Sequence, residues 1–520
     1  MAHLDTTSAQ SYFDNLRPGH TADYRGVEFT ESLLGRLLEK LQVDGRPHLH
    51  NAKFNGAKFA GAADFSKVDF SGDVAFTWAE FTGDALFSRA VFSQSAWFEN
   101  VKFAGLVRFS GARFKGGDAR FSESEFMRNV RFDDVTFNHA ARFNGAAFRA
   151  SSRFGPLRAV ELELTGALFL APLTIEAAAN SVLCQRTRWE AATIMRLRYA
   201  LVDLSNAAPT QPTAISAHPS PFEGLDETPL TPGGADAAPA VCLLSLQGAD
   251  VSQLVLNNVD MKRCTFSGAF HLDQLRLEGG CEFSRPPTWI RGVWPPRRWS
   301  KRITIAEENR WRATAKGRWK KRRYPGWSYE QGDPEPVNEP TPETLSVVYR
   351  QLRKGFEDSK NEPDAADFYY GEMEMRKRDK RRPWVERRLL GVYWLVSGYG
   401  LRAARAFACL ITAMAVTALA LMLWGLPNGS LQPKTTGKVT DQNISLKTEQ
   451  PSPELTLTGK NRISWDRTEK AIRVTLNAAI FRSPSQNLTT LGTFIEMAAR
   501  FIEPVLLALA ILAIRGRIRR

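Results

Sequence analysis

The stretch FTWAEFTGDALFSRAVFSQSAWFENVKFAGLVRFSGARF, residues 76–114, places a phenylalanine at alternating gaps of five and six residues. The residue two positions before each of these rings is small or β-branched. The pattern extends from residue 54 to residue 154, with a one-residue slip after Phe114. A spacing that recurs in this way identifies a repeat protein, so the repeat decides the architecture. The predicted core rings are Phe54, Phe59, Phe65, Phe70, Phe76, Phe81, Phe87, Phe92, Phe98, Phe103, Phe109 and Phe114, followed by Phe121, Phe126, Phe132, Phe137, Phe143, Phe148 and Phe154.

The spacing excludes the two simplest structures. On a helix, steps of five and six residues rotate the side chain by about 140° and 240°, which would divide the rings between two stripes. On a straight strand, an odd step of five moves the ring to the opposite face. A chain that turns a corner about every five residues keeps all the rings on one side. Stacked coils of this kind form a β-solenoid, so we expect a mainly β fold.

The repeat resembles the pentapeptide-repeat family, whose motif centres on Leu or Phe with Ala two residues earlier. The resemblance implies a right-handed quadrilateral β-helix. Strict members of the family step by five residues, whereas five and six alternate here. The alternation predicts eleven residues for two sides and twenty-two for one square coil.

A weaker register continues beyond Phe154. Its predicted inward positions are Phe169, Ile175, Cys184, Trp189, Ile194, Tyr199 and Leu204. Residues 205–240 are rich in Pro, Ala, Thr and Ser, so we expect a disordered loop there. The register resumes with Leu246, Val251, Leu256, Met261, Phe266, Leu272, Leu277 and Phe283. We therefore predict one solenoid, formed by residues 51–204 and continued by residues 241–284.

The N-terminal segment, residues 1–50, is predicted to close one end of the solenoid, because an open coil exposes strand edges. Residues 30–41, TESLLGRLLEKL, have the leucine spacing of an amphipathic helix that can cap this end. The first ten residues, MAHLDTTSAQ, lack the basic and apolar regions of a signal peptide. Five cysteines form no disulfide framework, and we interpret them as small residues of a reducing compartment.

Two apolar segments near the C-terminus predict membrane-spanning helices, at residues 401–426 and 494–514. Residues 406–426 are twenty-one residues without a charge, which is long enough to cross a bilayer. The second segment carries Glu496, Arg500 and Glu503, and an interfacial or buried helix is the alternative there.

Basic residues precede the first span and follow the second in the tail 515–520. The positive-inside rule therefore predicts that both termini lie in the cytoplasm. The resemblance to pentapeptide-repeat proteins implies that the membrane is a bacterial inner membrane. Residues 427–493 would form an extracytoplasmic loop, whose first half has the composition of an unstructured segment.

Residues 285–341 form a basic segment rich in tryptophan, with fourteen Lys and Arg against two Glu between positions 285 and 325. Basic charge next to indole rings can bind anionic lipid head groups or nucleic acid, or form a solvated face. In a membrane-anchored chain the lipid interpretation is favoured and nucleic acid is disfavoured. The candidate lipid-binding residues are Arg297, Arg298, Lys320, Lys321, Arg322 and Arg323.

Residues 342–400 contain apolar stripes on either side of the KNEPD turn, which predicts a helical hairpin. This stretch looks like the module that joins the repeats to the membrane in membrane-anchored bacterial pentapeptide-repeat proteins, some of whose relatives end in a two-helix ion-channel domain. Thr489, Thr490 and Gly492 match part of a potassium-channel filter, preceded by a plausible re-entrant helix at 471–481. The following Tyr and Gly of the filter are replaced by Thr493 and Phe494, so the candidate pore loop is degenerate.

The sequence supports no catalytic, cofactor or metal site. The seven His are scattered, and no phosphate loop, nucleophile elbow or zinc spacing occurs. DNA mimicry, which some pentapeptide-repeat proteins use, needs an acidic rod, whereas residues 51–154 hold fourteen basic and eleven acidic residues. We therefore expect a non-enzymatic scaffold that binds an unknown cytosolic protein, with oligomerisation possible. The alternative is a two-span channel-like protein coupled to the solenoid.

Overall fold

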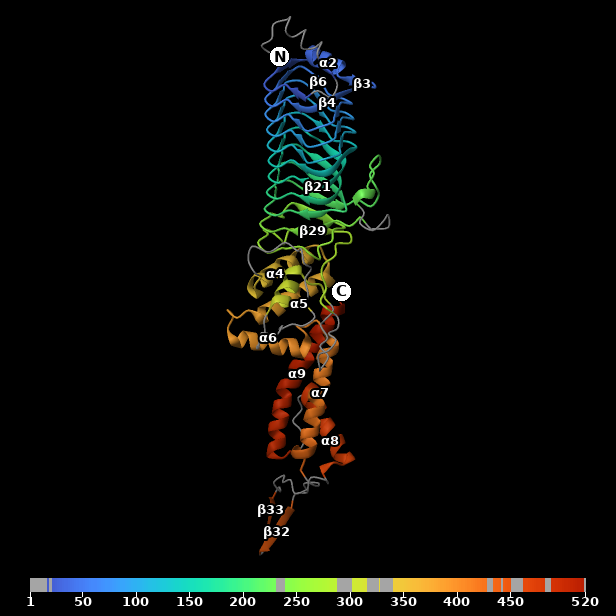
Figure 1. Cartoon of the computed structure of the whole chain (residues 1–520). Coiled ribbons are helices and arrows are strands. Elements are labelled where there is room, and N and C mark those ends of the chain that lie inside the picture. The colour runs from blue at the N-terminus through green and yellow to red at the C-terminus, as the bar shows by residue number, and fades with distance from the viewer. Residues whose placement is uncertain are drawn as a thin grey trace. The chain divides into compact units, whose positions relative to one another are not determined.

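A computed structural model describes most of the chain, which forms two compact units, Met1–Glu372 and Met373–Arg520. The first unit contains a parallel β-solenoid of about ten turns and the second contains two long apolar helices (Figure 1). The predicted fold class is thus confirmed, while the handedness and the square outline of the coils stay predictions. The described residues are 16–17, 21–230, 239–287, 302–315, 327, 340–427, 434–440, 443–449, 462–481 and 488–518.

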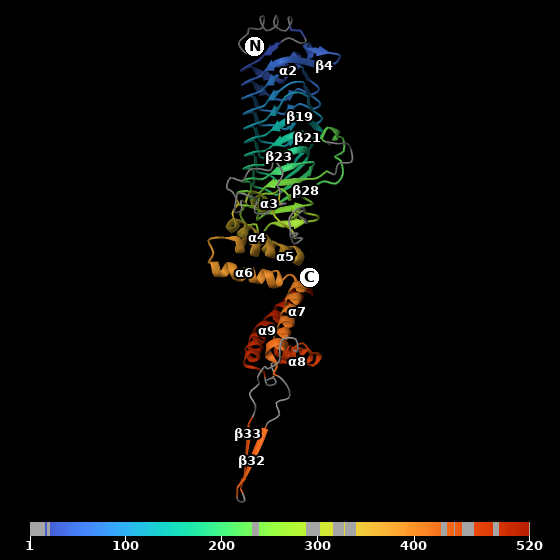
Figure 2. The same ribbon diagram turned by 60° about the horizontal axis from the view of Figure 1, so that its bottom comes forward.

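The coils of the solenoid pair in parallel through short strands that lie in register (Figure 2). One sheet contains β2 (Glu28–Thr30), β5 (Lys58–Ala60), β9 (Glu80–Phe81), β13 (Lys102–Phe103), β17 (Glu125–Phe126), β20 (Ala147–Phe148), β22 (Leu168–Phe169), β24 (Arg188–Trp189) and β27 (Ala208–Pro209). A second contains β6 (Ala63–Asp64), β10 (Ala85–Leu86), β14 (Val107–Arg108) and β18 (Val130–Arg131).

The largest sheet holds the remaining strands of the solenoid. They are β1 (Thr21–Asp23), β3 (Gln42–Val43), β4 (Arg46–Lys53), β7 (Asp69–Phe70), β8 (Val74–Ala75), β11 (Val91–Phe92), β12 (Ala96–Trp97), β15 (Arg113–Phe114), β16 (Ala119–Arg120), β19 (Val135–Arg142), β21 (Arg153–Glu163), β23 (Leu173–Leu183), β25 (Thr193–Arg198), β26 (Leu201–Asp203), β28 (Thr213–Ala217), β29 (Cys242–Ser245), β30 (Leu254–Asn257) and β31 (Arg276–Glu278).

The phenylalanines form four columns inside the coils. Phe54 stacks on Phe76 at 4.9 Å between ring centroids, and Phe59 stacks on Phe81 at 4.4 Å. The other two columns begin with Phe65 on Phe87 and Phe70 on Phe92. Stacked partners are 22 residues apart in these coils, as the alternating spacing requires. Each of the predicted rings from Phe54 to Phe114 is at most 2% exposed, so these phenylalanines form the core of the solenoid.

From residue 153 onward the coils change shape. The strands β21 and β23 are eleven residues long, whereas most strands of the earlier coils have two residues and the longest, β4 and β19, have eight. Side chains along a straight strand alternate between the two faces. In β25 the inward residue is therefore Met195, which is fully buried, whereas Ile194 is 44% exposed. The prediction that Ile194 points inward is wrong, and Tyr199 is only half-buried beside the strand.

Residues 205–217 belong to the solenoid, so the expected disordered loop at 205–240 is wrong for this part. Strand β27 pairs with β24, and β28 pairs with β25 and then with β30. Backbone hydrogen bonds between coils tolerate the polar composition that suggested a loop. Residues 218–230, which we call the side loop, leave the coil and end in the 3-10 turn η1 (Thr228–Leu230).

The first coil begins about thirty residues before the predicted start of the repeats. Tyr24 stacks on Phe54 and Phe29 stacks on Phe59, at centroid distances of 5.3 and 5.2 Å. Helix α2 (Glu31–Lys40) follows β2, and the Thr30 hydroxyl caps its N-terminus by accepting from the Leu33 N–H. The predicted capping helix is therefore an insertion within the first coil, with Leu34 and Leu37 buried.

Helix α3 (Ala306–Thr314) covers the last coil, which sequence reasoning did not foresee. The buried carboxylate of Glu307 accepts hydrogen bonds from the backbone N–H groups of Phe266 and Ser267, at 2.9 and 2.7 Å. Among the described residues no later strand pairs with the edge to which these donors belong, so Glu307 satisfies the end of the ladder. Burial raises the pKa of Glu307, and the hydrogen bonds from Ser267 and Phe266 oppose that rise.

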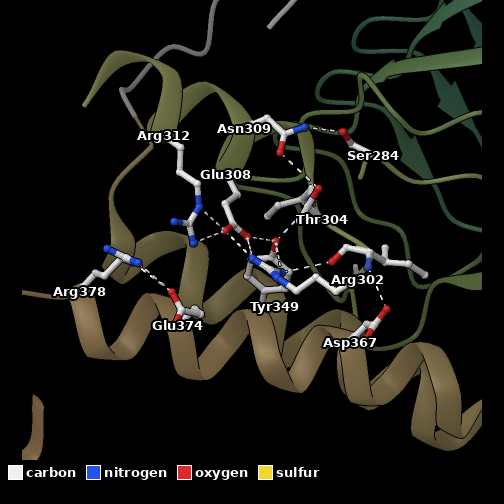
Figure 3. A network of polar contacts seen from close by, with 12 residues as sticks. Ser284, Arg302, Thr304, Glu308, Asn309, Arg312, Tyr349, Asp367, Glu374 and Arg378 are labelled. Carbon is white, nitrogen blue, oxygen red and sulfur yellow. Dashed lines mark hydrogen bonds and ion pairs between the residues drawn. The ribbon is translucent and has the colours of Figure 1, made fainter. Parts of the chain in front are cut away.

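A buried ionic network joins α3 to the helical hairpin (Figure 3). Glu308 accepts from Arg302 at 2.5 Å, from Arg312 at 2.6 Å and from the Tyr349 hydroxyl. Burial alone would raise the pKa of Glu308, but Arg302 and Arg312 outweigh it and lower this pKa to about 2. The hairpin consists of α4 (Pro342–Asp358) and α5 (Glu362–Arg378). Its helices pack through Phe356 on Phe368, whose ring centroids lie 4.9 Å apart.

The second unit contains more structure than two spans. Helix α6 (Trp384–Ser397) precedes α7 (Ala403–Ala420), which continues through the π-helical turn η3 (Leu421–Gly425). Helix α8 (Trp465–Leu476) continues through η5 (Asn477–Phe481), and α9 runs from Thr490 to Ile518. The strands β32 (Lys434–Thr440) and β33 (Asn443–Glu449) form an antiparallel hairpin where an unstructured segment was expected.

Candidate functional site

A buried ion pair holds the side loop against the coils. The Arg198 guanidinium donates from Nε to Glu227 at 2.7 Å and from Nη1 to the His218 carbonyl at 2.9 Å. The side chains of Arg198 and Glu227 are only 4% and 7% exposed. A buried pair of this kind is costly to break, because the remaining charge stays in the protein without a partner. The side loop is thus an ordered feature of the solenoid surface.

Further contacts attach both ends of the side loop. Phe222 and Leu230 pack against Ala178 of strand β23. The imidazole of His218 stacks on the Phe222 ring at a centroid distance of 4.9 Å. Arg158, which is itself buried, donates to the Asp226 carbonyl at 3.0 Å. The loop is held by apolar and charged contacts that lie on three neighbouring long strands.

A groove of about 780 Å³ lies between the side loop and the outer face of the coils. Its charged lining comprises Arg131, Asp133, Asp134, Arg153, Glu176, His218 and Glu223, and Ser152, Ser220 and Phe222 are among its other residues. Arg153 forms an ion pair with Glu176 at 2.9 Å. Within the described part of the chain, Arg131 forms no ion pair and is exposed. The groove therefore offers charges of both signs, of which at least one is available to a ligand.

Arg131 belongs to a column of like charges. Arg108 lies beside it in register on the neighbouring strand, and Arg153 follows in the next coil, where Phe154 packs on Phe132. Like charges opposite each other on paired strands are destabilising. On another sheet of the solenoid the charges alternate in register, along Lys58, Glu80, Lys102 and Glu125. Arg120 and Arg142 also lie opposite each other, but both form ion pairs with Asp118. The arginine column is thus an unfavourable arrangement that an acidic ligand would relieve.

The candidate lipid-binding residues and the possible metal ligands can be compared with the structure. All six candidate lipid-binding residues lie outside the described residues. Arg302 and Arg312, from the same basic segment, are buried with Glu308 and are not available to lipid. Among the described residues, no group of three His, Cys, Asp or Glu side chains is placed to hold a metal ion.

The candidate pore residues join two helices. The Thr489 hydroxyl donates to the Trp424 carbonyl at 2.7 Å and accepts from the Gly492 N–H at 3.1 Å. Thr490 is the first residue of α9, and Gly492 lies in its first turn. A Cβ atom on Gly492 would lie 2.4 Å from the Gly425 carbonyl oxygen. These residues therefore form a helix cap and a close helix contact, and their backbone is not the extended loop of a filter.

The groove was missed by sequence reasoning because its parts are far apart in the chain. Arg131 and Glu223 are ninety-two positions apart, and Arg198 and Glu227 are separated by a stretch interpreted as a linker. One signal was present. The sequence PSPFEGL at 219–225 places a phenylalanine in a stretch otherwise poor in large apolar residues, which is typical of an anchored loop.

Comparison with known proteins supports the repeat. Residues 76–122 match the model of a family described as pentapeptide repeats (9 copies). No curated protein and no solved structure matches the chain. With the solenoid and its stacked rings, the match shows that this chain carries pentapeptide repeats. It combines them with two helices, Ala403–Gly425 and Thr490–Ile514, that are long and apolar enough to cross a membrane.

Proposed function

We propose that this protein is a non-enzymatic, membrane-anchored scaffold whose solenoid binds a cytosolic protein. The observation that carries the proposal is the ordered side loop, which forms a polar groove beside a column of arginines, of which Arg131 forms no ion pair in the described part of the chain. Repeat surfaces bind partners through the features that depart from the repeat. The groove supplies charge and shape, and it does not bring together a nucleophile, a base and an orienting group.

The arginine column suggests the chemistry of the partner. A partner segment that carries carboxylates along Arg108 and Arg131 would separate the like charges with charge-assisted hydrogen bonds. Asp134 and Glu223, which also line the groove, would favour a hydrogen-bond donor on the same partner segment. The partner would therefore be a protein segment with acidic residues next to a basic or amide residue.

Three helices support membrane anchoring. Besides α7 and α9, helix α6 has an exposed apolar face with Val385, Leu389 and Val392 at a spacing of four and three residues. Arg387 and Arg388 lie between these residues in the sequence. An apolar face flanked by arginines is typical of a helix that lies in the membrane interface and contacts anionic head groups. We propose that the membrane is a bacterial inner membrane and that both termini lie in the cytoplasm. A reporter fused after Arg520 tests this orientation, and it should report the cytoplasm.

The binding role can be tested by cross-linking in cells that contain the full-length protein. Partners are captured, quantified by mass spectrometry and compared between Arg131→Glu and a matched control, Arg89→Glu, which reverses an exposed arginine that does not line the groove. We expect a specific partner to be reduced about tenfold by Arg131→Glu and to be retained by Arg89→Glu. Equal recovery in both variants, or equal loss, would show that the groove does not bind the partner.

A further inference from the structure

The two apolar helices present two kinds of surface. Ile411 and Leu419 of α7 and Phe501 of α9 are large and exposed, as expected of side chains that face lipid. The strip between the helices is different, because small residues dominate it. Ala408, Cys409, Thr412, Ala413, Thr417 and Ala420 of α7 lie along it together with Ala498 and Ala499 of α9. In membranes, small residues mark surfaces where another helix approaches closely.

This strip is a groove of about 630 Å³. Its lining on α7 extends from Arg405 to Ala420, which at the rise of a helix is about 22 Å, most of the thickness of a hydrocarbon core. Helices α7 and α9 lie side by side in both views of the ribbon (Figures 1 and 2). A long, straight groove between two packed helices has the shape that a third helix fills.

A buried carboxyl group lies in the groove. Glu503 is 1% exposed, and in the described part of the chain the Thr417 hydroxyl lies beside its carboxyl group without forming a hydrogen bond of normal geometry to either oxygen atom. The Thr417 side chain lines the same groove. A carboxyl group without a partner at this depth is costly, and in membrane proteins such groups pair with donors from neighbouring helices.

The arginines beside the groove are already engaged. Arg500 forms an ion pair with Glu496 at 2.8 Å on the same helix. Arg405 donates to the Trp394 carbonyl at 3.1 Å and lies over the Trp394 ring. A second copy of the chain would bring the same two arginines, each with its own partner, so the donor for Glu503 is expected from a different helix.

We infer that the groove between α7 and α9 is the docking site for a transmembrane helix of another membrane protein, which carries Lys, Arg, Asn or Gln at the depth of Glu503. The small residues admit its backbone, and Glu503 selects it by charge and hydrogen bonding. The inference rests on the proposed membrane anchoring. It adds a second, intramembrane partner site that is independent of the groove on the solenoid.

The test uses the native Cys409, which is half-exposed and lines the groove. Full-length protein is reconstituted in liposomes with a synthetic Leu/Ala helix of about 20 residues that carries one cysteine and a central lysine. A second helix has leucine in place of the lysine. The rate of disulfide formation with Cys409 is measured under mild oxidation, and Cys409→Ser serves as the blank. We expect the lysine helix to react about fivefold faster than the leucine helix.

Variants of the full-length protein complete the test. Glu503→Leu should make the two helices react at the same rate while leaving thermal stability unchanged or raised, because it removes an unpaired buried group. The control Phe501→Leu, at an exposed position two residues away, should keep the preference for lysine. Equal rates of the two helices with the unaltered protein would overturn the inference, as would a Cys409-dependent dimer of the chain that excludes both helices. Failure of the protein to float with the liposomes would instead contradict the membrane anchoring.

Discussion

The early and the late coils of the solenoid bury their inward side chains in different ways. Between Phe54 and Phe148 most sides of the coil are two-residue strands, and the inward phenylalanines are buried. From Arg153 onward, eleven-residue strands replace pairs of short sides, and the inward residues alternate along them. The early coils leave little room for insertions, whereas the long strands form a flat face to which the side loop is attached. Regular repetition therefore provides rigidity, and the departure from it provides a site.

The largest expected effect is in the regular coils. Phe92 is fully buried and stacks on Phe70 and Phe114 at 4.8 and 4.3 Å. Phe92→Asp places an unpaired charge between stacked rings, so the free energy of unfolding should fall by several kcal/mol. The exposed Arg89→Ala should change it by less than about 0.5 kcal/mol. Thermal unfolding of both variants checks the contrast, and equal losses would contradict the inward position of the ring.

In the late coils, a substitution that detaches the side loop should remove the groove while the coils stay folded. Glu227→Ala leaves the buried Arg198 without its carboxylate, and we expect the side loop to detach at a cost of about 3–5 kcal/mol. Hydrogen exchange should rise in residues 218–230, while the coils around Phe92 remain protected. Exchange that rises equally in the early coils would mean that the side loop supports the whole solenoid, which would remove the distinction between the two regions.

The cap at the end of the coils should respond to acid. A carboxylate whose pKa is lower in the folded than in the unfolded protein stabilises the fold above the unfolded value and loses that contribution as pH falls. For Glu308 this loss occurs between pH 4.5 and a pH of about 2, and the free energy of unfolding falls by at most about 3 kcal/mol. Glu307, whose pKa is raised by burial, acts in the opposite sense. Hydrogen exchange of α3 against pH measures the balance, and Glu308→Gln should lack the acid-dependent loss.

The smallest expected loss of stability is in the apolar helices, where α7 and α9 approach closely at Gly425 and Gly492. Gly492→Val would force a Cβ atom to within 2.4 Å of the Gly425 carbonyl oxygen, so the ends of α7 and α9 must separate at a cost of about 1–3 kcal/mol. Gly391→Ala, with no atom within 4 Å of the added group, should be tolerated. Thermal stability in detergent checks both. A cation leak in liposomes that Gly492→Val abolishes would instead support the channel alternative.

The sequence by itself determined the interior of the repeat and the apolar helices. Each conclusion depends on residues within one coil or one helix, because a ring every five or six residues can only face inward if the chain turns corners. The length and composition of residues 406–426 are a local property in the same way. The prediction that Ile194 points inward was wrong, because side chains alternate between the two faces of a straight strand there. Met195 is the buried residue instead.

Only the tertiary structure decided the cap, the side loop and the two grooves. Glu307 meets Phe266 from forty-one positions away, and Arg198 meets Glu227 from twenty-nine. Glu503 is buried because α9 packs on α7, which no spacing within either helix predicts. These features depend on which charged groups meet after the chain has folded. A polar side chain carries no periodic signal of its partner, since its free energy is determined by the contacts that replace water and not by its neighbours in sequence.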